Sequence, residues 1–165
     1  LALTPDLRAV HSRPMPVFEA GRRVGFRLRA CPVVRLSRAL NGHRAGAEVD
    51  AFLAHCFKAG PVVAVDREAV YRNWLTTRLG KPSDSGASVE SARVAGMSRE
   101  PLFRRMQGEV RTPRRLERMD VRFEGVLVVS DGERLLGRLR RGIGRHRAFG
   151  FGALMIVPPG QPYSA

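Results

Sequence analysis

The sequence predicts an α+β domain in which strands and helices follow the order strand, helix, strand, strand, helix, strand. Stretches that alternate apolar and polar residues, as half-buried strands do, are separated by stretches with the apolar spacing of helices. The chain has 165 residues, 44% of them apolar, which is enough for one well-buried domain. We expect this domain to span residues 22–160, between an irregular segment at 1–21 and a short tail at 161–165.

The first predicted strand covers residues 24–30, which alternate cleanly. Phe26 and Leu28 fall on one face, and Arg27 and Arg29 fall on the other. Successive side chains of a strand point to opposite faces of a sheet. One face of this strand is therefore expected to be buried, and the other to present arginines to a ligand or simply to solvent.

Two helices are predicted next. Residues 48–58 carry apolar side chains at helical spacing, at positions 49, 52, 53 and 56, and Gly60 follows them. Residues 67–79 form the second candidate, closed by Gly80. Because the second helix stands between another helix and the next strand, we interpret it as an insertion into the basic fold.

The remaining elements complete the order. Residues 89–97 and 102–106 alternate weakly, and residues 118–130 give the longest strand signal in the chain. A capped amphipathic helix is predicted at 131–141, and a last strand at 151–157. Without the inserted helix, this is the ferredoxin-like arrangement, in which two helices cover one face of a four-stranded antiparallel sheet and leave the other face open.

The segment after the predicted helix at 131–141 is rich in glycine and positive charge. Glycines occupy positions 142, 144, 150 and 152, and they surround Arg145, His146 and Arg147. Glycine allows a backbone to approach a ligand closely, so this loop suits a phosphate chain. A helix C-cap followed by a turn without a ligand explains the same spacing.

The charge balance points to a polyanionic partner. Lys and Arg number 29 against 15 Asp and Glu, a formal net charge of +14. Only Lys58 and Lys81 are lysines, and arginine forks onto phosphates and stacks on bases better than lysine does. Nucleic acid is the first hypothesis for the partner.

The most basic stretch lies between the predicted middle strands, at residues 104–118. A hairpin with arginines on both arms suits the groove of a structured RNA. A solvated hairpin without a partner is the alternative, although close arginines repel one another. The arginines are Arg104, Arg105, Arg111, Arg114, Arg115 and Arg118.

Several classes of protein are not favoured. Cys31 and Cys56 lack the spacing of a metal site, so neither a metal nor another cofactor is expected. No apolar run reaches the roughly 18 residues of a membrane span, and no signal-peptide pattern opens the sequence. We therefore expect a cytoplasmic protein with no membrane partner.

Three motifs, Phe26–Pro32, Phe123–Leu127 and Gly142–Gly152, resemble CasE in order and separation. This family comprises the CRISPR RNA-processing endoribonuclease subunit of the type I-E Cascade complex. The resemblance implies two tandem ferredoxin-like domains, of which residues 22–160 are the second, RNA-binding one. Residues 1–21 are then expected to be the end of a truncated first domain or a linker.

The resemblance also implies an activity. Family members cleave precursor CRISPR RNA without a metal at the base of the repeat stem-loop, leaving a 2′,3′-cyclic phosphate and a 5′-OH. The family's catalytic histidine lies in its first domain, and His11, His43 and His55 do not match it. The catalytic residue is therefore unknown. His146 is a candidate for which we expect an RNA contact rather than catalysis, and we expect this chain alone to be inactive.

The expected partners are the CRISPR RNA stem-loop, which the protein keeps after cleavage, and other Cascade subunits, above all the adjacent backbone subunit. The alternatives are a non-catalytic RNA-hairpin-binding subunit and a basic ribosome-associated protein. The predicted RNA-binding residues are the six hairpin arginines with Arg27, Arg29, Gly142, Gly144, Arg145, His146, Arg147, Gly150 and Gly152.

Overall fold

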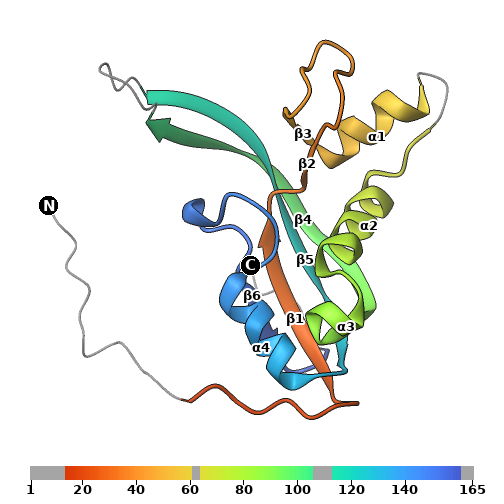
Figure 1. Cartoon of the computed structure of the whole chain (residues 1–165), viewed down its shortest axis with the longest axis vertical. Coiled ribbons are helices and arrows are strands. Elements are labelled where there is room, and N and C mark those ends of the chain that lie inside the picture. Colours follow the sequence, from red (N-terminus) through yellow and green to blue (C-terminus); the bar gives the residue numbers. More distant parts are fainter. Residues whose placement is uncertain (1–13, 61–63, 106–112, 161–165) are drawn as a thin grey trace, which may run out of the picture.

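The computed structural model describes residues 14–60, 64–105 and 113–160. Within them, four strands form one antiparallel sheet in the order β4-β5-β1-β6 (Figure 1). The first strand thus lies between the last strand and the central hairpin, which is the ferredoxin-like order and confirms the predicted fold. The strands are β1 (Arg23–Ala30), β4 (Ala87–Arg105), β5 (Pro113–Val129) and β6 (Leu154–Val157).

Strands β4 and β5 form a hairpin that is much longer than the rest of the sheet. Their pairing runs from Ala87 opposite Val129 to Arg105 opposite Pro113, whereas β5 pairs with β1 only from residue 121 to residue 128. Residues 98–105 and 113–120 therefore extend past the sheet as a two-stranded ribbon (Figure 1). We call this extension the distal ribbon.

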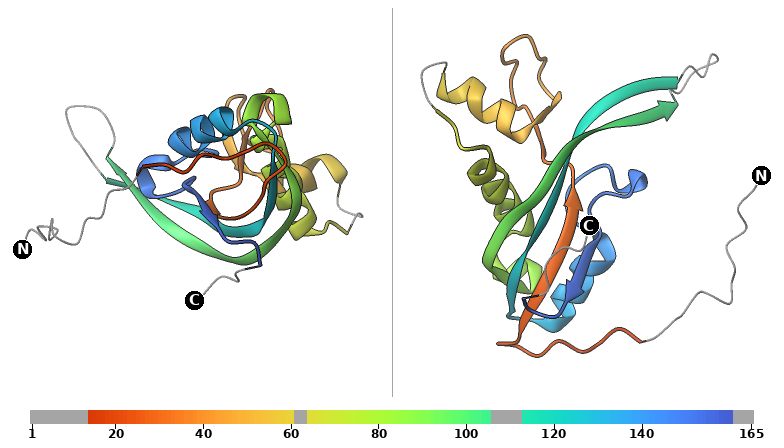
Figure 2. Two further views of the ribbon diagram at one scale, coloured as in Figure 1. Left: turned by 90° about the horizontal axis from the view of Figure 1, so that it is seen from below. Right: turned by 180° about the vertical axis from the view of Figure 1, so that it is seen from behind.

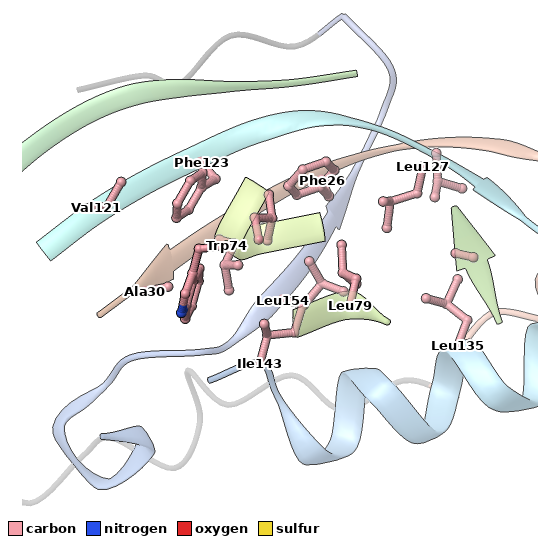
Figure 3. Close-up of a cluster of buried hydrophobic side chains, with 14 of the residues drawn as sticks. Phe26, Ala30, Trp74, Leu79, Val121, Phe123, Leu127, Leu135, Ile143 and Leu154 are labelled. Carbon is pink, nitrogen blue, oxygen red and sulfur yellow. The ribbon is translucent and has the colours of Figure 1, made fainter. Parts of the chain in front are cut away.

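The helices that cover the sheet gather on one of its faces, as the further views show (Figure 2). They are α2 (Arg67–Leu79), the single-turn α3 (Pro82–Ser85) and α4 (Gly132–Arg141). Side chains of α2 and α4 pack on the apolar face of β1 and β5 (Figure 3). The centre of this core is formed by Phe26, Leu28, Tyr71, Trp74, Leu75, Phe123, Leu127 and Leu135.

Helix α1 (Ala51–Ala59) lies beside the main fold rather than on the sheet. It accompanies a small two-stranded sheet of β2 (Val33–Arg35) and β3 (Glu48–Asp50), and it shares with them a separate apolar cluster. We call residues 33–59 the β2–β3 arm. The interpretation of residues 67–79 as an insertion is therefore corrected: α2 covers the sheet with the large buried side chains Tyr71, Trp74, Leu75 and Leu79, whereas α1 buries only two alanines and is the additional helix.

The helix expected at 48–58 begins three residues later than predicted. The carboxylate of Asp50 accepts hydrogen bonds from the backbone N–H groups of Phe52 and Leu53, at 2.9 and 3.2 Å, and so caps the helix. Glu48 and Val49 consequently belong to β3. Among the described residues, no helix is long and apolar enough to span a membrane.

Candidate nucleic-acid interface

The glycine-rich segment closes on itself and is attached to the end of β1. The N–H of Ile143 donates to the carbonyl of Gly152 at 2.8 Å, and the N–H of Gly152 donates to the carbonyl of Arg29 at 2.7 Å. A Cβ on Gly152 would lie 2.5 Å from the carbonyl oxygen of Ile143, and one on Gly144 would lie 3.1 Å from the ring of Trp74. These glycines are therefore required by the packing of the loop itself.

The C-cap interpretation of Gly142 is also correct, because its N–H donates to the carbonyl of Arg138 at 2.8 Å. Gly150 differs from the other loop glycines in being exposed. Arg147 is exposed as well, and its guanidinium donates to the carbonyl oxygen of Arg141 at the end of α4. The contacts with RNA expected from these loop residues stay a prediction.

The tip of the loop rests on the β2–β3 arm through one carboxylate. Oε1 of Glu48 forms an ion pair with Nε of Arg145, and Oε2 of Glu48 lies 3.1 Å from Nε2 of His146. The side chains of His146 and Glu48 are only 15% and 19% exposed. His146 also has a φ of +62°, which is uncommon outside glycine. The loop and the arm are thus joined at a single acidic residue.

The environment of His146 favours its neutral form. Burial lowers the pKa of His146 from its ordinary value of 6.5, and nearby Arg118 lowers it as well, whereas Glu48 opposes them by raising it. Burial has the largest effect because an imidazolium loses hydration there. Near neutral pH the positive charge at this site therefore comes from arginines.

A cavity of about 590 Å³ opens where the glycine-rich loop, the β2–β3 arm and the base of the distal ribbon meet. Its charged walls bring together residues that are far apart in the sequence. The residues that line it are Arg35, Arg44, Gly46, Ala47, Glu48, Leu116, Arg118, Arg145 and His146. We call it the arginine cavity.

The predicted hairpin arginines distribute along the distal ribbon. Arg104 stands opposite Arg114 in the register, and Arg111 lies outside the described residues. Arg115 is exposed and pairs with Glu117 at 3.4 Å, whereas Arg118 is half-buried and reaches the arginine cavity. The structure therefore joins one end of the basic hairpin to the glycine-rich loop, which the sequence pattern did not indicate.

The two arginines predicted on β1 lie on the sheet face opposite the helices, as their alternation with buried residues requires. Nε of Arg29 donates to Oδ2 of Asp120 at 2.7 Å, and its guanidinium lies over the ring of Phe151 at 4.9 Å. Arg27 is aligned with Glu124 on β5. Neighbouring carboxylates thus offset part of the charge of this face.

Sequence reasoning missed three residues of this region: Glu48, Arg35 and Arg44. Glu48 falls inside the predicted helix at 48–58, and the two arginines lie between this helix and the predicted strand at 24–30. Arg35 is in β2, directly opposite Glu48 in the register of the arm. No sequence spacing links these residues to the glycine-rich loop, because Glu48 contacts Arg145, which lies 97 residues further along the chain.

Comparisons with known proteins agree with this architecture. A family described as "CRISPR associated protein" matches residues 3–158, and the chain belongs to this family. It is 31% identical over 145 residues to the CRISPR-associated endoribonuclease Cse3 of Thermus thermophilus, covering 87% of the chain and 59% of that protein. The resemblance to CasE drawn from the three motifs is thereby confirmed.

Two solved structures extend the likeness to three dimensions. CRISPR endoribonuclease Cse3 bound to a 19-nucleotide RNA has a TM-score of 0.60 and 28% identity, over 89% of this chain and 61% of that one. Thermus thermophilus Cse3 bound to an RNA representing a pre-cleavage complex has a TM-score of 0.54 and 29% identity, over 87% and 57%. The chain thus spans about three fifths of the length of these relatives.

Proposed function

We propose that this chain is the RNA-holding part of a CRISPR RNA endoribonuclease. The protein that carries it cleaves precursor CRISPR RNA at the base of the repeat stem-loop and stays bound to the 3′ hairpin. Within Cascade it contacts the adjacent backbone subunit. The complex functions in antiviral defence. Its cytoplasmic location stays a prediction.

The main observation that supports RNA binding is the arginine cavity at the base of the distal ribbon. Four arginines face it against one carboxylate, and arginine is the side chain best suited to hold phosphates in a fixed geometry. The ribbon adds Arg115, which is exposed, and two arginines, Arg104 and Arg114, that stand opposite each other in the strand register. The likeness to RNA-bound Cse3 supports the same partner for this chain.

The proposed chemistry is metal-independent. The ribose 2′-OH attacks the adjacent phosphorus, the bond to the 5′-oxygen breaks, and the products are a 2′,3′-cyclic phosphate and a 5′-OH. A placed general acid or base contributes about 10² to 10⁴ in rate to such a step, and cations stabilise the charge that develops on the phosphoryl oxygens. The arginines of this chain supply that stabilisation, and the acid or base comes from outside these 165 residues.

An RNA cleavage assay in EDTA tests the proposal. Residues 1–165 alone should bind a synthetic RNA of the CRISPR repeat from the same genome, and leave it intact. The full-length protein should cut the same RNA once, at the base of the stem. Cleavage by residues 1–165 that His146→Ala abolishes would place the active site in the glycine-rich loop instead. Binding without cleavage by the full-length protein would support the non-catalytic alternative.

A further inference from the structure

We propose that Glu48 is an internal stand-in for an RNA phosphate. Its carboxylate pairs with Arg145 and lies 3.1 Å from Nε2 of His146 while the arginine cavity is free of RNA, and a phosphate of the bound strand takes its place. The inference rests on the proposed RNA-binding function and adds a residue that opposes binding. Glu48 then determines how tightly the cavity accepts RNA.

The first argument is the geometry of the carboxylate. Each of its oxygens faces a different side chain of the loop tip, with Arg145 at Oε1 and His146 at Oε2. A phosphate presents two oxygens to a guanidinium and a neighbouring donor in the same manner. Because Glu48 is only 19% exposed, this contact is built into the site.

The second argument is the charge around the cavity. Four arginines and one carboxylate leave a balance of +3 when His146 is neutral. One carboxylate therefore compensates only a quarter of the guanidinium charge. Nε of Arg118 and Nε2 of His146 are both buried and have no hydrogen-bond partner among the described residues. A buried donor without a partner is costly, so this site is better satisfied with a further anion.

The third argument is the position of Glu48 in the fold. It lies on the β2–β3 arm, opposite Arg35, and its contacts with Arg145 and His146 link the arm to the glycine-rich loop. A phosphate that displaced Glu48 would bind the loop tip while leaving the hydrogen bonds that fix the loop to β1 intact. Replacement is therefore possible without unfolding the loop.

The consequence is a competition within the protein. RNA must first displace a carboxylate that repels it, so Glu48 weakens RNA binding. The effect is largest for anions that cannot contact both Arg145 and His146. Removing the charge of Glu48 should tighten binding, although it also removes an ion pair. If Glu48 only stabilised the contact between the arm and the loop, removing its charge would weaken RNA binding.

The test compares Glu48→Gln with Glu90→Gln in the full-length protein that carries this chain. Glu90 also pairs with an arginine, Arg23, at 2.7 Å, and its side chain is 38% exposed. Both substitutions raise the net charge by one, but only the first lies at the arginine cavity. The probe is the synthetic repeat stem-loop RNA, titrated at low salt.

We expect Glu48→Gln to lower the Kd by about five-fold or more and Glu90→Gln to change it by less than about two-fold. Arg145→Gln should then cost more affinity in the Glu48→Gln background than in the original protein, because Arg145 is released for the phosphate. Glu48→Asp, whose side chain is shorter by one methylene, provides a second variant. Thermal unfolding followed by circular dichroism verifies that the variants are folded.

Unchanged or weaker binding by folded Glu48→Gln and Glu48→Asp would overturn the inference and leave the proposed function standing. Equal tightening by Glu90→Gln would overturn it as well, since net charge alone would explain the result. Failure of the unsubstituted protein to bind the stem-loop would overturn the proposed function, and this inference with it.

Discussion

Nε1 of Trp74 donates a hydrogen bond to the carbonyl oxygen of Val33 at 3.1 Å, and the bond is buried. It ties α2, which covers the sheet, to the start of the β2–β3 arm. The same indole ring stacks on Phe123 with 6.2 Å between centroids and also limits the space beside Gly144. One side chain thus positions the arm and the glycine-rich loop relative to the sheet.

Trp74→Phe should therefore destabilise the fold by about 1 to 3 kcal/mol, because it removes the indole donor and leaves a gap in the core. Urea unfolding followed by circular dichroism measures the change, since Trp74 is the single tryptophan of the chain and its fluorescence is lost. Thr76→Ala, on the exposed side of the same helix, should stay within about 0.5 kcal/mol. Equal stability of the two variants would contradict the role of Trp74.

Gly152→Ala should be more damaging than Gly150→Ala, although both glycines have φ near +80°. The φ angle alone costs an alanine about 1 to 2 kcal/mol. At position 152 the new Cβ would also meet the carbonyl oxygen of Ile143 at 2.5 Å, whereas at 150 the nearest atom is 3.9 Å away on Arg29. Paired unfolding measurements check this, and equal costs would show that the loop does not close as described.

His146 should titrate below its ordinary pKa of 6.5, because burial disfavours the imidazolium. The unfolded chain then takes up a proton more readily than the folded one, so the stability from this residue falls as pH drops through 6.5. NMR titration of the His146 ring measures the midpoint. Glu48→Gln should lower it further, because Glu48 raises this pKa. A midpoint above 6.5 would contradict the assigned environment.

Replacing Arg114 and Arg115 together with alanine should weaken binding of the repeat stem-loop by about 1 to 3 kcal/mol for each strong arginine–phosphate interaction that the substitution removes. The dependence of log Kd on log salt should also become shallower, by about 0.7 to 0.9 for each such interaction. Arg72→Ala, at an exposed position of α2, is the control. An unchanged affinity and salt slope in the double variant would remove the distal ribbon from the interface.

The sequence predicted the fold well where one periodicity persisted. Arg67–Leu79 is a helix over the predicted residues, and strand β1 differs by one residue from the alternating stretch. The sequence pattern divides strand β4 in two at residues 98–101, which hold three polar residues and a proline, whereas the bulges between Val89 and Ser91 and between Val94 and Gly96 weaken the alternation inside the first part. Pro101 added to the division, yet β4 is an edge strand, where proline is tolerated.

The candidate site was predictable only in part, because one of the elements that form it has little periodicity in its sequence. The arginines of the hairpin and the loop stand out in composition, so they were found as two separate groups. Their meeting at the arginine cavity depends on the β2–β3 arm, whose short strands carry little periodic signal. Because Val49 fits the helical spacing of the apolar residues that follow it, the pattern extends the helix past its N-cap Asp50, so Glu48 falls inside the predicted helix and its contact with the loop is not predicted.

The most direct measurement is the affinity of the full-length protein for the repeat stem-loop relative to an unpaired RNA of the same composition, at about 0.15 M salt. Because the ribbon and the arginine cavity offer charges at fixed positions, we expect the stem-loop to bind at least about ten-fold more tightly than the unpaired RNA. Equal affinity for the two RNAs would contradict it, since the basic surface would then attract any polyanion without recognising a hairpin.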